Sequence, residues 1–217
     1  MEKNNGKIIA VAALVVAVIG LSVGFAAFAA TLTIENISAT MTADNQFTEN
    51  VNYQSVAPTC YVTGTSASVV GTYNAGTASG KLWSGINVPL TMTQKSVTCQ
   101  ATIENNSAYR AALDSISIGG TFTCNSVAAS GTEGYATNAS TICAGTQVTV
   151  STGSATKVFT NASHDALTGI TGTSIASNGG TAPVTVTIEY TGDVAADGDV
   201  SITIPTISLN YKSAAAE

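Results

Sequence analysis

The residues that most often perform catalysis are scarce in this chain, and those that occur together are poorly spaced for it. The sole histidine, His164, lies between Ser163 and Asp165. A catalytic triad needs these three side chains to meet in space, whereas adjacent residues point apart in a regular backbone. No H-E-x-x-H sequence is present that would place two zinc ligands and a base on one helix. We therefore predict that the protein is not an enzyme and has no catalytic residue, no cofactor and no metal site.

Three carboxylates follow one another closely in the segment T-G-D-V-A-A-D-G-D. They are Asp193, Asp197 and Asp199. Carboxylate oxygens in such a cluster could contribute to a calcium site. Asp and Gly are also the residues that favour turn conformations. We favour the turn, and calcium binding remains the alternative.

Four cysteines are the other residues with a defined chemistry. They are Cys60, Cys99, Cys124 and Cys143. Four cysteines allow three pairings. We favour Cys60 with Cys99 and Cys124 with Cys143, because neighbours in the sequence need no crossing of the chain. A zinc site is disfavoured, since there is no C-x-x-C pair and only one histidine.

An uncharged apolar run covers residues 8–30 and follows Lys3 and Lys7. As a helix it would span about 35 Å, which is enough to cross a bilayer. Its A-F-A ending suits cleavage by a signal peptidase between Ala29 and Ala30. Two interpretations remain: a cleaved signal peptide, which we favour, and a retained membrane anchor. In both, the remainder of the chain is exported to the cell surface or the extracellular space.

The composition favours strands and excludes several classes of protein. Only 9% of the residues are charged, and 33 Thr and 22 Ser make up about a quarter of the chain. The net charge of −6 does not suit a nucleic-acid partner. Coiled coils carry more charge, and disordered chains have fewer apolar residues. β-Branched Thr and Val pack well on a pleated sheet.

Short runs in which apolar and polar residues alternate predict the strands. We expect one helical turn at residues 107–113 and long surface loops at 125–144 and 161–180. The pattern predicts an all-β fold, an antiparallel β-sandwich preceded by a hydrophobic leader helix. The expected strands are residues 31–41, 61–65, 68–73, 86–92, 97–105, 115–124, 147–151, 157–160, 184–190 and 200–211.

We expect the chain to be divided into three segments. Residues 1–29 are the leader, residues 30–42 are an N-terminal arm, and residues 43–217 are the β-sandwich domain. The arm contains the strand-like run T-L-T-I-E-N-I-S-A-T-M. A strand at a chain end can complete its own sheet or pair with the open edge of a neighbour. The second arrangement does not close on itself and builds filaments. The residues leave both arrangements open.

Two further features have a functional and a structural interpretation. Trp83 is the only tryptophan, and it could stack on a ligand or fill the core; we favour the core. N-x-S/T sequons could accept a glycan or arise by chance in a chain this rich in Ser and Thr. They begin at Asn36, Asn105, Asn138 and Asn161.

Three patches of the sequence resemble one known family. They are the leader end V-G-F-A-A-F-A-A-T-L-T-I, the run A-T-I-E-N-N-S-A-Y-R-A-A-L-D-S-I-S-I, and the closing run from V-T-V-T-I-E-Y to S-L-N-Y-K. They are similar to the TasA/camelysin-like exported surface proteins of Gram-positive-type bacteria. The four cysteines and the low lysine content depart from that group. Camelysin relatives have been called metalloproteases, but without a zinc motif here we do not transfer that activity.

The resemblance implies a jelly-roll-like sandwich, a dedicated signal peptidase and assembly into biofilm matrix fibres by donor-strand exchange. The donor would be roughly residues 30–41, with Leu32, Ile34 and Ile37 filling a groove in the next copy. We therefore expect a structural fibre subunit that associates with itself. The alternative is a tethered or secreted binding module that contacts ligands through the loops at 126–144 and 161–180.

Overall fold

The structure is a computed structural model that describes residues 47–62 and 74–214. Residues 47–50 form a short helical turn, and the unit to which the described residues belong begins at Phe47. Several expectations lie outside the described residues. These are the leader helix, the cleavage between Ala29 and Ala30, the strands at 31–41 and 68–73, and the donor residues Leu32, Ile34 and Ile37.

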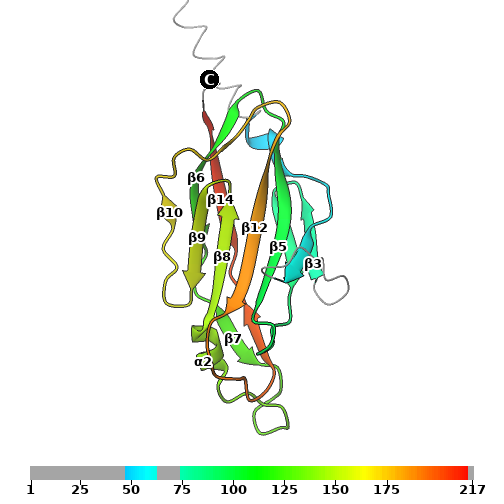
Figure 1. The fold of residues 1–217 in the computed structure, drawn as a ribbon, viewed down its shortest axis with the longest axis vertical. Helices are drawn as coiled ribbons and strands as arrows, with labels where there is room; N and C mark the ends of the chain where they lie inside the picture. The colour runs from blue at the N-terminus through cyan, green and yellow to red at the C-terminus, as the bar shows by residue number, and fades with distance from the viewer. Residues whose placement is uncertain (1–46, 63–73, 215–217) are drawn as a thin grey trace, which may run out of the picture. The chain divides into compact units, whose positions relative to one another are not determined.

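The larger of the sheets has six strands, all antiparallel to their neighbours. In Figure 1, β5, β12, β8 and β9 lie side by side. Two short strands, β1 and β2, pair with different parts of β5. The strand order is β1 (Val51–Tyr53), β5 (Ser96–Asn105), β12 (Gly180–Tyr190), β8 (Thr146–Thr152) and β9 (Ala155–Thr160), with β2 (Thr59–Val62) also on β5.

A second antiparallel sheet, behind the first in Figure 1, is organised around β6 (Arg110–Ile118). β14 (Ile207–Ala214) pairs with β6 over its whole length. The short strands β10 (Leu167–Thr168) and β11 (Ser174–Ile175) pair with parts of it. The described chain is thus all-β with antiparallel sheets, as the sequence predicts.

Two strand pairs and one short helix complete the described elements. β3 (Asn74–Ser79) forms a hairpin with β4 (Leu82–Asn87), and β7 (Thr123–Ser126) pairs with β13 (Val200–Thr203). The helix α2 covers Ala139–Ala144. Within residues 47–62 and 74–214, no helix is long and apolar enough to cross a membrane.

The main hydrophobic cluster joins the two larger sheets. Leu113 and Ile116 of β6 pack with Val148 and Val150 of β8, and all four are almost completely buried. Alternate residues of a strand share one face, so both sheets direct their apolar faces to this cluster. Its buried members are Leu113, Ile116, Phe122, Cys143, Val148, Val150, Ala155 and Phe159.

The strand predictions at 97–105 and 184–190 are confirmed by β5 and β12, and the run at 200–211 is interrupted near Pro205 as expected. The helical turn at 107–113 is wrong, because Arg110 begins β6 and pairs with β14. The run at 115–124 is two strands separated by residues 119–122, not one bent strand.

The strand predicted at 86–92 is also wrong, since β4 ends at Asn87 and Pro89 cannot donate to a ladder. The sequence pattern does not predict the hairpin that contains β4. This hairpin depends on Gly76, whose φ is 72°, and a Cβ at this position would lie 2.0 Å from the carbonyl oxygen of Ser84. Only glycine allows the two strands to approach so closely at this point.

Candidate functional site

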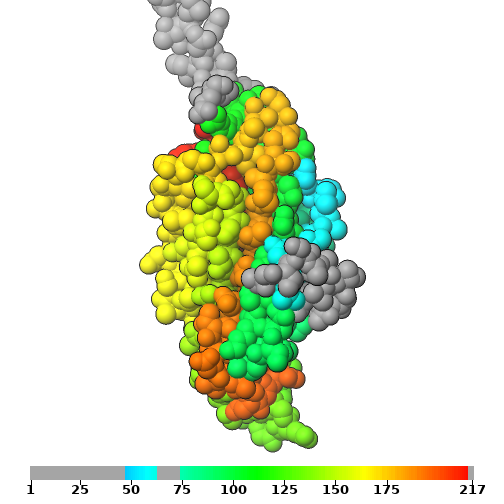
Figure 2. All heavy atoms as spheres, viewed as in Figure 1, coloured from blue at the N-terminus to red at the C-terminus, as the bar shows by residue number. Residues whose placement is uncertain are grey.

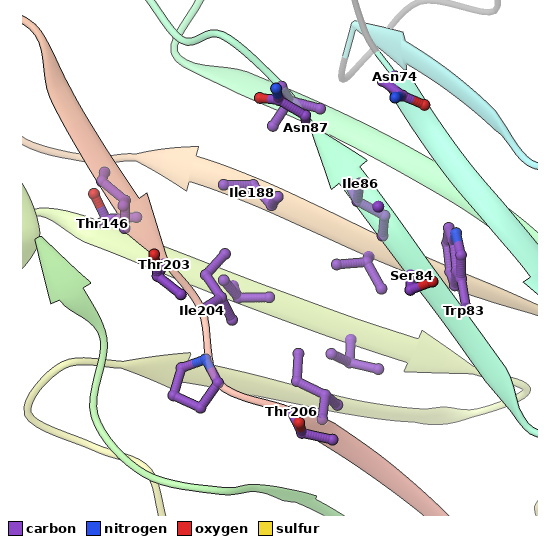
Figure 3. A pocket seen from close by; sticks show the side chains of 18 of the residues that line it. Asn74, Trp83, Ser84, Ile86, Asn87, Thr146, Ile188, Thr203, Ile204 and Thr206 are labelled. Atoms are coloured by element: carbon purple, nitrogen blue, oxygen red, sulfur yellow. The ribbon is translucent and has the colours of Figure 1, made fainter. Parts of the chain in front are cut away.

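A long groove with a volume of about 1720 Å³ and an aliphatic floor lies in the described part of the chain. Its floor is the inward face of the six-stranded sheet, and its two walls are β4 and the segment from β13 to β14. Figure 3 shows Trp83 and Ile86 on β4, Ile204 on the opposite wall and Ile188 between them.

The floor of the groove consists of aliphatic side chains, two of which, on β12, are only partly covered by the rest of the described chain. On β12, Val184 is 1% exposed, whereas Val186 and Ile188 on the same face are only partly buried. Val148 and Val150 of the adjacent β8 also line the groove. Val148 and Val150 are already buried, so Val186 and Ile188 are the floor side chains that a partner could cover further, with a gain of about 25 cal/mol per Å² of apolar surface removed from water.

The two walls are strands that each have one partner in the described part of the chain. β14 pairs with β6, and β4 pairs with β3. Both β4 and β14 line the groove. Within residues 47–62 and 74–214, the second edge of each of these strands has no strand partner, and such an edge can pair with a further strand.

Aromatic residues close one end of the groove, which we call the entry end. Tyr53 and Trp83 meet edge to face with ring centroids 6.1 Å apart. The hydroxyl groups of Tyr211 and Thr152 are 3.5 Å apart. Burial, and secondarily the proximity of Tyr211, raises the pKa of Tyr53 to about 12. Tyr53, Trp83 and Tyr211 pack against a cluster that contains the buried Phe47, so the described chain begins at this end.

The opposite end of the groove, the far end, is held by a network around Asp197. Its carboxylate accepts hydrogen bonds from the backbone N of Thr137 at 2.9 Å, from the Thr137 hydroxyl, and from the backbone N of Asn138 at 3.3 Å. Asn138 Nδ2 in turn donates to the carbonyl oxygen of Ala195 at 2.8 Å. The hydrogen bond from Thr137, supported by the backbone donors, lowers the pKa of Asp197, although desolvation opposes it. These bonds join the loop before α2 to the loop between β12 and β13.

Both of the favoured disulfides are present. Cys124–Cys143 joins β7 to α2, beside the Asp197 network at the far end. Cys60–Cys99 joins directly opposed residues of β2 and β5, beneath the β3–β4 hairpin. The two bonds thus brace the parts of the structure that carry the far end and one wall of the groove.

The outer face of the six-stranded sheet, which is turned toward the viewer in Figure 2, carries polar side chains that pair across neighbouring strands. Thr98 and Thr187 lie opposite each other on β5 and β12, with hydroxyl oxygens 2.8 Å apart. Gln147 on β8 donates to Glu189 on β12 at 2.7 Å. These groups satisfy one another's hydrogen bonds across the strands.

The remaining catalytic and metal candidates do not form a site. Ser163, His164 and Asp165 lie in an exposed loop. Asp193 lies 3.6 Å from Lys95, while the carboxylate of Asp197 is occupied as described above. In the described ranges no three metal-binding side chains come together.

The asparagine side chains of the three sequons in the described chain make different hydrogen bonds. Asn105 is fully buried, and its Nδ2 donates to the carbonyl oxygens of Tyr109, Ile175 and Ala176. Asn138 belongs to the Asp197 network. Asn161 Oδ1 accepts from the backbone N of Phe122 at 3.0 Å. Asn105 therefore pins the turn between β5 and β6 and is inaccessible for modification in the folded chain.

Comparison of the chain with protein-family models, curated proteins and solved structures gave no match. The alternation in β12 predicts that Val186 and Ile188 face inward. It contains no signal that these two side chains are only partly buried in the folded chain. Trp83, expected in the core, is partly buried and packs against two hydrophobic clusters, and it also lines the groove wall.

Proposed function

We propose that the protein is an exported structural subunit of a surface fibre or biofilm matrix, in which the N-terminal arm of one copy fills the groove of the next. The observation that carries the proposal is the groove between β4 and β14, each of which has one edge without a strand partner among the described residues. A groove of this kind accepts an extended strand, which gains backbone hydrogen bonds from an edge and specificity from alternate side chains.

The arm has the length and the pattern to occupy the groove. Its run from Thr31 to Met41 has 11 residues, about 36 Å when extended, whereas the eight residues of β14 span about 27 Å. Leu32 and Ile34 alternate with polar residues, whereas Ile37 is one position out of phase with them, so a β-bulge between Ile34 and Ile37 is needed to place all three on one face. These three side chains would cover Val186 and Ile188, while the backbone of the arm pairs with β14.

An inserted strand would also complete the fold. The second layer consists of two separate pieces, the β3–β4 hairpin and the sheet around β6. A strand between β4 and β14 would join them into one sheet opposite the six-stranded sheet. We propose that the result is the jelly-roll-like sandwich that the family resemblance implies, complete only in the assembled protein.

The two disulfides suit the proposed location outside the cytoplasm. Disulfides form and persist in oxidising compartments. All four cysteines of the chain are used in them. They support the subunit at its far end and beneath one groove wall, as a surface fibre exposed to proteases would require.

Electron microscopy of two purified chains tests the function. We expect filaments from the chain that starts at Ala30 and folded monomers from the chain that starts at Ala43. Folded monomers from both at high concentration, with disulfides intact, would refute self-assembly. In that case the groove would instead bind an extended segment of another protein, which is how a binding module would use it.

A further inference from the structure

We infer that the arm of one copy runs antiparallel to β14 of the next, with Leu32 at the entry end and Met41 at the far end of the acceptor groove. This inference rests on the proposed function and adds the direction of insertion. It follows from where the described chain begins and from the direction of the groove wall. The inserted strand would consequently run parallel to β4, because β4 and β14 run in opposite directions (Figure 3).

The direction of β14 relative to the two ends of the groove is fixed by strand pairing. Ile207 of β14 lies opposite Ile118, and Ala214 opposite Arg110. The aromatic residue Tyr211 is near the end of the strand and belongs to the entry end, where Phe47 is also buried. β14 therefore runs from the far end toward the entry end.

The position of Phe47 restricts how a copy could fill its own groove. Met41 precedes Phe47 by only six positions in the sequence, a reach of at most about 22 Å. Met41 would therefore stay near the entry end, and the rest of the arm would extend toward the far end. In its own groove the arm would thus run parallel to β14.

Exchange in that same parallel direction would not build a fibre. The donor's Met41 would lie at the acceptor's entry end, so the two entry ends would face each other. Each copy could then give its arm to the other, and the reciprocal exchange closes as a dimer. The parallel direction leads to monomers or closed dimers.

Antiparallel insertion places the donor's Met41 at the acceptor's far end. The donor's entry end then meets the acceptor's far end, and the donor's own far end remains available for a further copy. Such a head-to-tail contact repeats without closing. Filament formation by the arm therefore requires the antiparallel direction.

The surface of the far end suits contact with a second copy. Val127 and Val194 expose 67% and 51% of their surface, and Tyr135 exposes 38%. They belong to the loops that the Asp197 network joins, and the backbone N of Val127 donates to the carbonyl oxygen of Asp199 at 2.8 Å. In the antiparallel arrangement this braced apolar surface meets the entry end of the donor.

Cross-linking between introduced cysteines tests the direction in the chain that starts at Ala30. The native cysteines are all in disulfides, so a bis-maleimide reacts only with introduced thiols. Ser208 and Lys212 on β14 lie roughly 14 Å apart, and a linker shorter than this distinguishes them. Four double variants are compared: T33C with K212C, S38C with S208C, T33C with S208C, and S38C with K212C.

Antiparallel insertion predicts that T33C/K212C and S38C/S208C give a ladder of covalent multimers on denaturing gels, at least five-fold more than the other two pairs. The single-cysteine variants give the background. Preferential cross-linking of T33C/S208C and S38C/K212C would overturn the direction, even if filaments form. Filaments that cross-link in none of the four pairs would overturn both the direction and the role of the arm. A chain that forms no filaments would instead refute the proposed function.

Discussion

The indole Nε1 of Trp83 donates a hydrogen bond to the carbonyl oxygen of Ala75, 2.8 Å away in the neighbouring strand of the hairpin. The only polar atom of the side chain is thus satisfied within the groove wall. The apolar surface of the ring is left partly exposed in the groove. An aromatic ring fixed in this way suits an apolar partner better than a ligand that needs a hydrogen bond from the indole.

A charge in the groove floor should prevent assembly without unfolding the protein. We expect Val186→Lys to abolish filaments, because an arm strand would bury the ammonium group, while the partly exposed position costs the monomer about 1–3 kcal/mol. Thr185→Lys is the matched control, since it lies next to Val186 on the outer face of β12 and should leave filaments intact. Electron microscopy and urea denaturation measure the two effects. Filaments from Val186→Lys would show that the groove is not the assembly site.

The Asp197 network should make the stability of the far end depend on pH. Hydrogen bonds to Thr137 and Asn138 lower the pKa of Asp197 from its ordinary value of 3.8. The contribution of the carboxylate is therefore fully present above about pH 5 and is lost as the pH falls through the lowered pKa. We expect Asp197→Asn to lower Tm at neutral pH by an amount that shrinks below pH 4. A difference in Tm that stays constant down to pH 2 would contradict this role.

The two disulfides should differ in their contribution to stability. Their partners are 39 and 19 residues apart. The loop-entropy relation predicts contributions of about 4 kcal/mol for Cys60–Cys99 and about 3 kcal/mol for Cys124–Cys143. Replacing each pair with alanine and measuring urea denaturation tests the order. A larger loss for the Cys124–Cys143 pair would mean that contacts at the far end, rather than loop closure, determine its effect.

Asn105 should be among the most sensitive polar positions. Its amide donates to three carbonyl oxygens, and its Oδ1 accepts from the backbone N and the hydroxyl of Ser107. Because these partners would be left buried, we expect Asn105→Ala to cost about 3 kcal/mol or more. The exposed neighbour Asn106 provides the control, and Asn106→Ala should change the unfolding free energy by less than about 0.5 kcal/mol. Equal effects at both positions would exclude the network as the cause.

The strands that sequence predicts well are those with long, regular alternation. In β12 the run V-T-V-T-I-E-Y alternates without interruption, and β5 is similar. Both lie in the interior of the six-stranded sheet, where alternation is enforced by an apolar face and a polar face. The favoured disulfide pairing is also the one observed, although the sequence alone does not exclude the other two pairings.

The elements that sequence reasoning missed depend on tertiary contacts. Arg110–Leu113 reads as a helical turn because R-A-A-L contains good helix formers, yet pairing with β14 overrides that propensity. The β3–β4 hairpin has little strand propensity in N-A-G-T-A-S and depends on the positive φ of Gly76. The groove could not be predicted, since a pattern shows which side chains point inward but not whether another element covers them.

The fluorescence of Trp83 provides the most direct test of the central claim, that the groove binds the arm. The chain has no other tryptophan, so its emission reports on the groove wall alone. A synthetic peptide with the sequence of Thr31–Met41 is titrated into the chain that starts at Ala43, with a scrambled peptide as the control. We expect a saturable shift of the emission to shorter wavelength with the native peptide only. An unchanged spectrum, or the same response to both peptides, would contradict it.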